Sequence, residues 1–93
     1  MRTIEWTTAF KRDHKREKKG RHKARLDALL GAAVAALVAD QPLLEANRDH
    51  ALVGEWDGCR ECHVKPDLLL IYRKPDADTL QLVRLGSHSE LFE

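Results

Sequence analysis

Two short segments that each contain a proline divide the C-terminal half of the chain into three runs typical of β-strands. The segments are "KPD" at 65–67 and "KPDAD" at 74–78. Proline lacks the amide hydrogen that a sheet ladder needs, so both prolines disfavour continuation of a strand. The three runs cover about residues 59–64, 68–73 and 79–85. Because the turns between them are short, the sequence predicts an antiparallel meander.

The N-terminal half is typical of one strand followed by two helices. "RTIEW" alternates in part and predicts an opening strand. Thr7 or Thr8 can cap a basic helix from about Ala9 to Lys19, which Gly20 would end. Leu and Val then recur at three- and four-residue spacing, which predicts a second helix from about His22 to Ala39. We therefore expect an α+β fold, with an antiparallel sheet of about four strands packed against an N-terminal two-helix hairpin.

The length of the chain limits both the number of domains and the kind of site. Its 93 residues suffice for one domain, so residues 1–93 are treated as one unit with a single core. Such a core leaves no room for a large internal cavity, and a site should be an open surface cleft. Residues 43–56 show no sustained periodicity and are predicted to form a long connection, which is often functional in compact domains.

Positive charge is concentrated near the N-terminus. The segment from Lys11 to Arg25 holds nine basic residues and two acidic ones, while the net charge of the whole chain is only +1. The basic residues are Lys11, Arg12, Lys15, Arg16, Lys18, Lys19, Arg21, Lys23 and Arg25. This asymmetry favours a polyanionic partner, either nucleic acid or an anionic membrane, although a solvated helix face would have the same composition.

The sequence shows no targeting or membrane-spanning segment. No apolar run reaches the roughly 18 residues that a spanning helix needs. The N-terminus also lacks the apolar stretch and cleavage site of a secretory signal. We therefore expect a cytoplasmic protein without a membrane partner, in which the two cysteines are free thiols rather than a disulfide.

Residues 59–63 read "CRECH", a string that also occurs in haem attachment and is compatible with zinc binding or thiol redox chemistry. If this segment is a strand, Cys59 and Cys62 face opposite sides of the sheet and cannot share one metal ion. There is no second cysteine pair to complete a zinc site, and the only methionine is Met1. The sequence therefore predicts no metal and no cofactor, and the thiols are expected to be sheet residues.

Three histidines lie at the ends of predicted elements. His50 is in the long connection, His63 precedes the first proline turn, and His88 follows the last strand. Asp67 lies on the same turn as His63. Because imidazole titrates near neutrality, paired histidines or a histidine and a carboxylate can exchange protons at cytosolic pH. Each histidine alone could be a surface residue, but three around one sheet indicate an acid–base site.

Two strand arginines and a C-terminal aromatic residue extend this hypothesis. Arg60 and Arg84 have the guanidinium geometry that suits phosphate, although each could instead pair with a neighbouring carboxylate such as Glu61 or Asp57. Phe92 could fill the core or stack on an RNA base. The RNA 2′-hydroxyl is its own nucleophile, so a base, an acid and a cation are the parts of a metal-independent ribonuclease.

The same motifs carry a resemblance to a known family. The strings are "EWTTAFKRDHKR" near the start, "RDHALVGEWDGCRECHVKPDLLLIY" in the middle and "RLGSHSELF" at the end. Through them the chain resembles the YafQ branch of the RelE/ParE superfamily of type II toxins, the bacterial mRNA interferases. The resemblance implies a single RelE-like domain over residues 1–93. It also implies catalytic positions at His50, His63, Asp67, His88 and Phe92, with Arg60 and Arg84 at the cleft.

The resemblance further implies a reaction and a set of partners. The expected reaction is ribosome-dependent cleavage of mRNA in the A site, giving a 2′,3′-cyclic phosphate and a 5′-hydroxyl. The expected partners are mRNA, the ribosome and a cognate antitoxin, with Lys15, Lys18 and Lys19 of the basic helix on ribosomal RNA. Leu68 departs from the family, which has a tryptophan there. The alternatives are a catalytically inactive binding module and a gyrase-type toxin, which lacks this histidine set.

Overall fold

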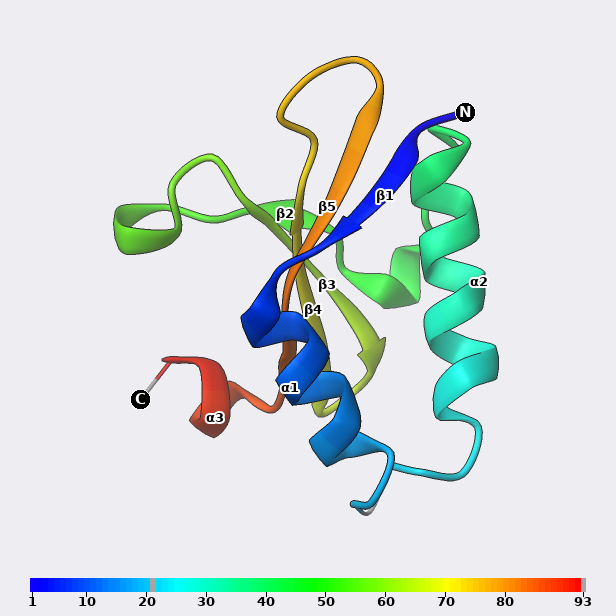
Figure 1. Ribbon diagram of the computed structural model, residues 1–93, viewed down its shortest axis with the longest axis vertical. Coiled ribbons are helices and arrows are strands. Elements are labelled where there is room, and N and C mark those ends of the chain that lie inside the picture. The colour runs from blue at the N-terminus through cyan, green and yellow to red at the C-terminus, as the bar shows by residue number, and fades with distance from the viewer. Residues whose placement is uncertain (21, 93) are drawn as a thin grey trace.

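The computed structural model describes residues 1–20 and 22–92. Arg21, one of the basic residues counted above, and Glu93 lie outside that description. The chain forms strands, α-helices and two 3₁₀ turns in the following order: β1 (Thr3–Trp6), α1 (Thr8–Glu17), α2 (Leu26–Val38), η1 (Glu45–Asn47), β2 (His50–Ala51), η2 (Gly54–Trp56), β3 (Arg60–Lys65), β4 (Leu68–Arg73), β5 (Thr79–Gly86) and α3 (His88–Phe92). Figure 1 shows one sheet with α1 and α2 on one side and α3 at the C-terminal end of β5.

The meander predicted from the proline turns is confirmed. β3 pairs with β4 and β4 with β5, both antiparallel, and the strand bounds lie within one residue of the predicted runs. The predicted α+β fold is confirmed, although the sheet has five strands instead of about four, in the order β1-β5-β4-β3-β2, and one of its pairings is not antiparallel. β1 runs parallel to β5, with Thr3 opposite Thr79. These strands are far apart in sequence, so no hairpin turn forces them to be antiparallel.

The predicted long connection at 43–56 contains β2, a strand that the sequence did not predict. β2 has only two residues, and it pairs with β3 so that His50 lies opposite Glu61. Two residues are too few for an alternation of polar and apolar side chains to be visible in the sequence. The connection is therefore an ordered edge of the sheet, and Asn47 fastens it further by donating from Nδ2 to the His63 carbonyl at 2.8 Å.

The two N-terminal helices match the predicted hairpin except where the second one begins. Thr7 caps α1 as expected, because its hydroxyl oxygen accepts a hydrogen bond from the Phe10 amide at 2.9 Å. α2 begins at Leu26, not near His22, because Arg25 has a φ of 66° and lies in the left-handed region. A residue in that conformation cannot continue a right-handed helix. Four residues of the predicted apolar stripe of α2 are buried: Leu26, Leu30, Ala33 and Leu37.

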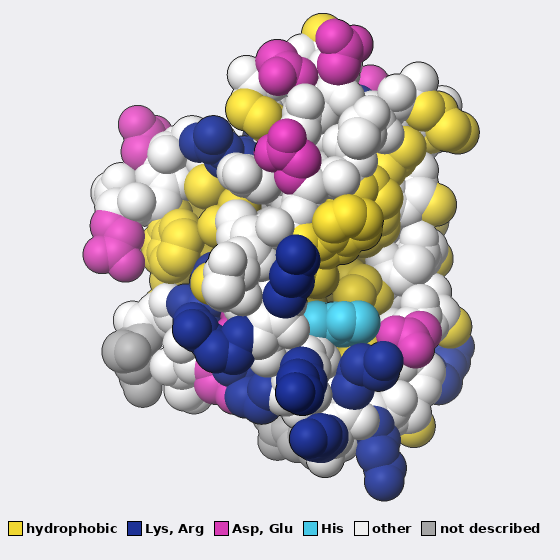
Figure 2. All heavy atoms as spheres, in the orientation of Figure 1, with side chains coloured by type: hydrophobic (Ala, Val, Ile, Leu, Met, Phe, Trp, Pro, Cys, Tyr) yellow, Lys and Arg dark blue, Asp and Glu magenta, His cyan; other side chains and the backbone are white. Residues whose placement is uncertain are grey.

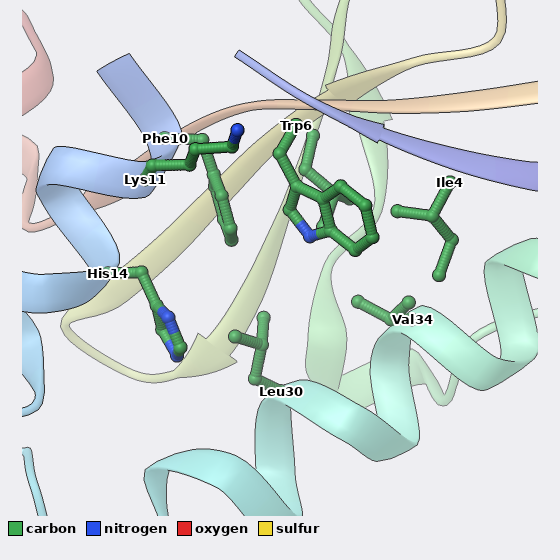
Figure 3. A pocket seen from close by; sticks show the side chains of 8 residues that line it. Ile4, Trp6, Phe10, Lys11, His14, Leu30 and Val34 are labelled. Carbon is green, nitrogen blue, oxygen red and sulfur yellow. The ribbon is translucent and has the colours of Figure 1, made fainter. Parts of the chain in front are cut away.

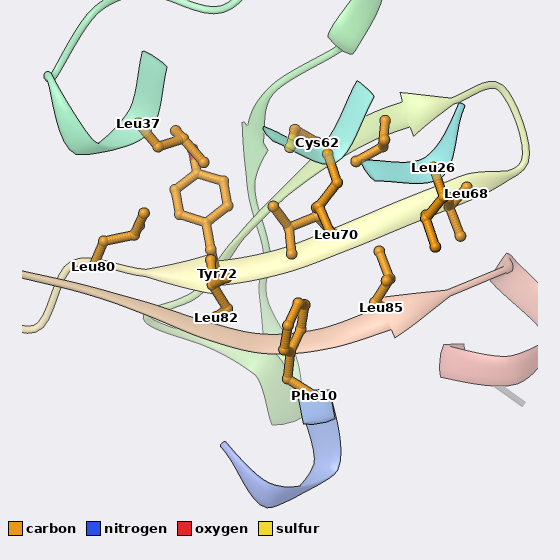
Figure 4. Packing of buried hydrophobic residues seen from close by; sticks show 12 residues of the cluster. Phe10, Leu26, Leu37, Cys62, Leu68, Leu70, Tyr72, Leu80, Leu82 and Leu85 are labelled. Carbon is orange, nitrogen blue, oxygen red and sulfur yellow. The ribbon is translucent and has the colours of Figure 1, made fainter. Parts of the chain in front are cut away.

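Apolar side chains cover both faces of the sheet, and Figure 4 shows those of the larger cluster. The first cluster, which we call the helix-side core, is closed by residues of α1 and α2, including Phe10 and Leu30. The second cluster, the open-side core, is smaller and is centred on Leu69, Ile71 and Leu91. Leu68, at the position where the resemblance leads us to expect tryptophan, is fully buried in the helix-side core. Within the described ranges, no helix has the length and apolar character needed to cross a bilayer.

The two cysteines lie on opposite faces of the sheet, as the strand interpretation predicted. Cys62 is fully buried in the helix-side core, whereas Cys59 packs against the open-side core. Both are free thiols. Burial raises the pKa of Cys62 to about 12, which leaves almost none of the nucleophilic thiolate at neutral pH.

We expect this difference in environment to appear in thiol labelling. In the native protein the disulfide reagent DTNB should modify Cys59 first and reach Cys62 only after unfolding in guanidinium, because only the thiolate reacts. Release of the thionitrobenzoate product measures each phase, and Cys59→Ser should remove the fast one. Equal and rapid reaction of both thiols in the folded protein would contradict the burial of Cys62.

Candidate active site

The open side of the sheet brings the predicted histidines together. Successive residues of β3 point to opposite faces, so Glu61 and His63 lie on the same face as their β4 partners Ile71 and Leu69. β2 then places His50 beside Glu61. The edge strand that the sequence did not reveal is therefore what positions His50 in the site.

Glu61 lies between two of the imidazoles. Its side chain is buried, with 3% of the residue exposed. Oε2 is 3.5 Å from His50 Nε2, and Oε1 is 3.7 Å from His63 Nε2. Among the described residues, Oε1 has no hydrogen-bond partner. A buried carboxylate without hydrogen bonds is costly, so the two imidazoles are its available counter-charges when they are protonated.

Sequence reasoning did not identify Glu61 as a site residue and considered it only as a pairing partner for Arg60. The signal that could have found it is the spacing of Glu61 and His63. Residues two apart on a strand share a face, so a carboxylate at this position had to neighbour the histidine. The residue that was missed therefore lies at the centre of the cluster.

Backbone carbonyls hold the rings of His50 and His63. His50 Nδ1 is 2.7 Å from the carbonyl oxygen of Arg48, and His63 Nδ1 is 3.4 Å from that of Pro66. With the proton on Nδ1, each ring donates to its carbonyl and leaves Nε2 facing Glu61. His50 is exposed and His63 is half-buried, so the two imidazoles differ in their access to a substrate.

α3 supplies the third histidine and the aromatic residue predicted for the site. The ring centroids of His63 and His88 are 6.5 Å apart, and those of His88 and Phe92 are 5.4 Å apart. Phe92 is 37% exposed and also makes an edge contact with Trp56, at 6.5 Å between centroids. The structure thus brings His50, His63, His88 and Phe92 together, and adds Trp56, which the sequence did not single out.

Asp67 lies on the β3–β4 turn, directly after Pro66, and is exposed. The carbonyl that contacts His63 Nδ1 belongs to Pro66, so Asp67 and His63 are linked through this turn. A surface pocket of about 300 Å³ opens next to this turn and is lined by Ala46, Arg48, His63 and Pro66. Of the predicted site residues, His63 lines this pocket.

The two arginines predicted for the cleft have different environments. Arg60 alternates with Glu61 and therefore points to the other face of the sheet, where its Nε donates to Asp49 Oδ1 at 3.2 Å. The Tyr72 hydroxyl donates to the same oxygen at 2.6 Å. The expectation that Arg60 lies in the cleft is therefore corrected. Its guanidinium instead helps to anchor the segment that precedes His50.

Arg84 lies on the open side, in register with Ile71. Its Nε and Nη2 donate to the fully buried carboxylate of Asp13, at 2.6 Å and 3.1 Å. This bidentate contact raises the pKa of Arg84 and aligns its guanidinium. Because a guanidinium has five N–H donors, Asp13 does not use all of them.

A basic surface lies next to this site. Lys15, Lys18 and Lys19 are exposed on α1 and directly after it. Figure 2 shows lysine and arginine side chains gathered over this part of the molecule. α1 is adjacent to α3, because Arg16 Nε on α1 is 3.1 Å from Glu90 Oε2 on α3. The basic surface therefore borders the helix that carries His88 and Phe92.

A larger groove, of about 400 Å³, lies on the helix side of the molecule (Figure 3). Its lining is mostly apolar and includes Ile4, Trp6 and Val34. The one imidazole that lines it belongs to His14, which is stacked on Phe10 with centroids 5.8 Å apart. No carboxylate is among its described lining residues, although His14 Nε2 is 3.5 Å from Oδ1 of the exposed Asp27 on α2.

Comparison with known proteins identifies a family. The family model described as "Bacterial toxin of type II toxin-antitoxin system, YafQ" matches residues 2–93. The mRNA interferase toxin YafQ of Escherichia coli K12 is 45% identical over 51 residues, a segment that spans 55% of this chain and 54% of that protein. The chain thus aligns with about half the length of this curated relative.

Solved structures match over the whole chain. A metal-bound toxin from Helicobacter pylori has a TM-score of 0.88 and 47% sequence identity, covering 99% of this chain and 100% of its own. YafQ in the E. coli DinJ–YafQ complex has a TM-score of 0.85 and 32% identity, with both chains fully covered. Within the part of this chain that the structure describes, no group of three or more His, Cys, Asp or Glu side chains is arranged to hold a metal ion. The match over residues 2–93 shows that the chain belongs to the YafQ family of bacterial toxins from type II toxin–antitoxin systems.

Proposed function

We propose that this chain is an mRNA endoribonuclease that acts as the toxin of a type II toxin–antitoxin pair. The single observation that carries the proposal is the cluster on the open side of the sheet, in which buried Glu61 lies between His50 and His63 and the His88 ring lies next to His63. The name of the E. coli relative as an mRNA interferase supports the same activity. The DinJ–YafQ complex supports a cognate antitoxin as partner.

In the proposed reaction, the 2′-hydroxyl oxygen of RNA attacks the adjacent phosphorus. One imidazole accepts the 2′-hydroxyl proton while the O2′–P bond forms. As the bond from phosphorus to the 5′-oxygen breaks, a second residue acts as the acid and donates a proton to that oxygen. The products are a 2′,3′-cyclic phosphate and a 5′-hydroxyl. His63 and His88, with ring centroids 6.5 Å apart, are spaced to act on the two sides of one phosphate.

Glu61 would stabilise the imidazolium that forms when a histidine accepts the proton. Its carboxylate is already buried next to His50 and His63, so it needs no reorganisation to meet the new charge. This arrangement resembles the support that a buried carboxylate gives to a catalytic histidine in other hydrolases. Asp67, on the turn that holds the His63 ring, is proposed as a further acid–base residue.

The remaining residues would hold the RNA. Arg84 lies on the same side of the sheet as His63, and its guanidinium, aligned by Asp13, could bind the phosphate charge that builds up in the transition state. Phe92 and Trp56 offer aromatic surface on which a base can stack. The exposed lysines of the basic surface would dock on ribosomal RNA, so that the ribosome presents mRNA to the cleft.

Replacing the central histidines tests the proposal directly. His63→Ala and His88→Ala should each lower cleavage of ribosome-bound mRNA by about 10²–10⁴-fold, since each removes an acid–base group. Phe92→Ala should cause a smaller loss, because it affects the position of the base and not proton transfer. Cleavage is measured with purified protein, in the presence and absence of ribosomes, together with growth arrest in cells that lack the antitoxin.

His14 is the matched control, because its ring lies on the helix side and contacts Phe10. His14→Ala should cleave normally per folded molecule, with thermal unfolding as the check on its fold. Full toxicity of a His63→Ala/His88→Ala double variant without antitoxin would refute the ribonuclease assignment. It would leave a binding module, or a gyrase-type toxin, as the remaining interpretation.

Glu61→Gln separates a catalytic from a structural role for the buried carboxylate. The amide keeps the shape but cannot neutralise an imidazolium, so the single-turnover rate should fall by about 10²-fold. The urea midpoint should stay the same or rise, because the change removes a buried carboxylate whose Oε1 has no hydrogen-bond partner among the described residues. Normal activity combined with a large loss of stability would show that Glu61 is only structural.

The basic surface should supply affinity without sequence selection. Replacing Lys15, Lys18 and Lys19 together by glutamine should weaken ribosome binding, because phosphate contacts release counterions. The slope of the logarithm of the binding constant against the logarithm of the salt concentration should become shallower by about one per lysine. The cleavage sites should not change. Lys74→Gln, at the β4–β5 turn, is the control, since Lys74 pairs with Asp40 at 2.6 Å. Normal binding by the triple variant in moderate salt would show that these lysines form only a solvated face.

A further inference from the structure

We infer that Arg16 is a positioning residue for the proposed active site, because it fixes the short helix that carries His88 and Phe92. This inference rests on the proposed ribonuclease function and assigns a task to a side chain outside the catalytic cluster. Arg16 lies on α1, whereas both site residues lie on α3. Charged contacts centred on the Arg16 guanidinium join these two helices.

The Arg16 guanidinium contacts three parts of the structure. On its own helix, Nη1 donates to Asp13 at 2.9 Å and Nε to Glu17 at 3.0 Å. Nη2 donates to the carbonyl of Leu85 at 2.9 Å, near the end of β5. Nε also lies 3.1 Å from Glu90 Oε2 on α3. One side chain therefore joins α1, the end of the last strand and the helix of the site.

α3 needs such an anchor because it is too short to be stable alone. It has five residues, fewer than the roughly 12–15 at which isolated helices become even marginally stable in water. Glu90 and Ser87 form a capping box, in which the Ser87 amide donates to Glu90 Oε1 at 2.8 Å and the Glu90 amide donates to Ser87 Oγ at 3.2 Å. The carboxylate that caps the helix is thus the same one that Arg16 holds.

Gly86 shows how closely these groups are packed. A methyl group added at Gly86 would lie 2.9 Å from Arg16 Nη2 and 3.1 Å from Glu90 Oε1. Any larger residue would therefore have to displace the Arg16–Glu90 pair. The backbone of Gly86 does not have a positive φ, so space is the constraint here. This packing holds the chain two residues before His88, where α3 begins.

The expected consequence is a loss of rate without a matching loss of binding. His88 is two residues before Glu90 on the same short helix, and its ring must stay near that of His63, at 6.5 Å between centroids. Small misplacements of a catalytic group are costly, up to about 10²-fold for 1 Å. Removing the anchor should leave both histidines present but set them at the wrong distance.

The experiment compares Arg16→Met with Arg12→Met. Both variants remove one exposed guanidinium from α1, but Arg12 lies one turn away from the contacts that Arg16 makes with β5 and α3. With wild-type-like folding confirmed by thermal unfolding, Arg16→Met should lower kcat on ribosome-bound mRNA by about 10–100-fold, with KM within about threefold of the Arg12→Met value. Arg12→Met should affect only KM.

A second variant covers the case in which Arg16→Met does not fold. Glu90→Gln keeps an oxygen for the Ser87 amide but removes the charged partner of Arg16, and the Glu90 side chain is 39% exposed. It should also lower kcat by about tenfold or more. The nuclear Overhauser contact between the His63 and His88 rings should weaken in Arg16→Met and Glu90→Gln and persist in Arg12→Met.

Two results would overturn the inference: an unchanged kcat with an unchanged ring contact in Glu90→Gln, or an equal fall in kcat in Arg12→Met and Arg16→Met. Failure of the proposed function would give a different result. In that case the wild-type protein cleaves no mRNA with or without ribosomes, and the ring contact alone decides whether Arg16 positions His88.

Discussion

The buried carboxylate of Asp13 is the interaction on which the arrangement of the site depends. It is fully buried and accepts four hydrogen bonds: one from Arg16, two from Arg84 and one from the Leu85 amide. Burial alone would raise the pKa of Asp13, but the hydrogen bonds and the two guanidinium groups outweigh it and lower the pKa. The charge is thus stable inside the fold, and it ties α1 to β5 and aligns both arginines at the edge of the site.

Local signals in the sequence were sufficient for the meander and for the histidines that it carries. The proline turns defined β3, β4 and β5, and the extended character of "CRECH" placed Cys59 and Cys62 on opposite faces. His63 and His88 were found because they end predicted strands. These features depend on residues close together in the chain, for which periodicity and turn chemistry are reliable guides.

The features that were missed depend on contacts between distant residues. The parallel pairing of β1 with β5 joins Thr3 to Thr79, and no local pattern records it. β2 is defined only by its pairing with β3, so neither the strand nor the place of His50 beside Glu61 was visible. Arg60 was placed in the cleft through the family resemblance. Its position one residue before Glu61 sends it to the other face, which simple alternation could have indicated.

Two buried carboxylates therefore differ in how their charge is met in this small domain. Asp13 has both oxygens satisfied and lies where α1 meets β5, as expected of a group that stabilises the fold. Glu61 is buried with one oxygen lacking a hydrogen-bond partner among the described residues, and it faces two histidines. A destabilising feature of this kind persists when the surrounding structure imposes it, and such features are concentrated at functional sites. In the proposed reaction, Glu61 would meet a charge that forms on a neighbouring imidazole, whereas Asp13 already has its guanidinium partners in the folded protein.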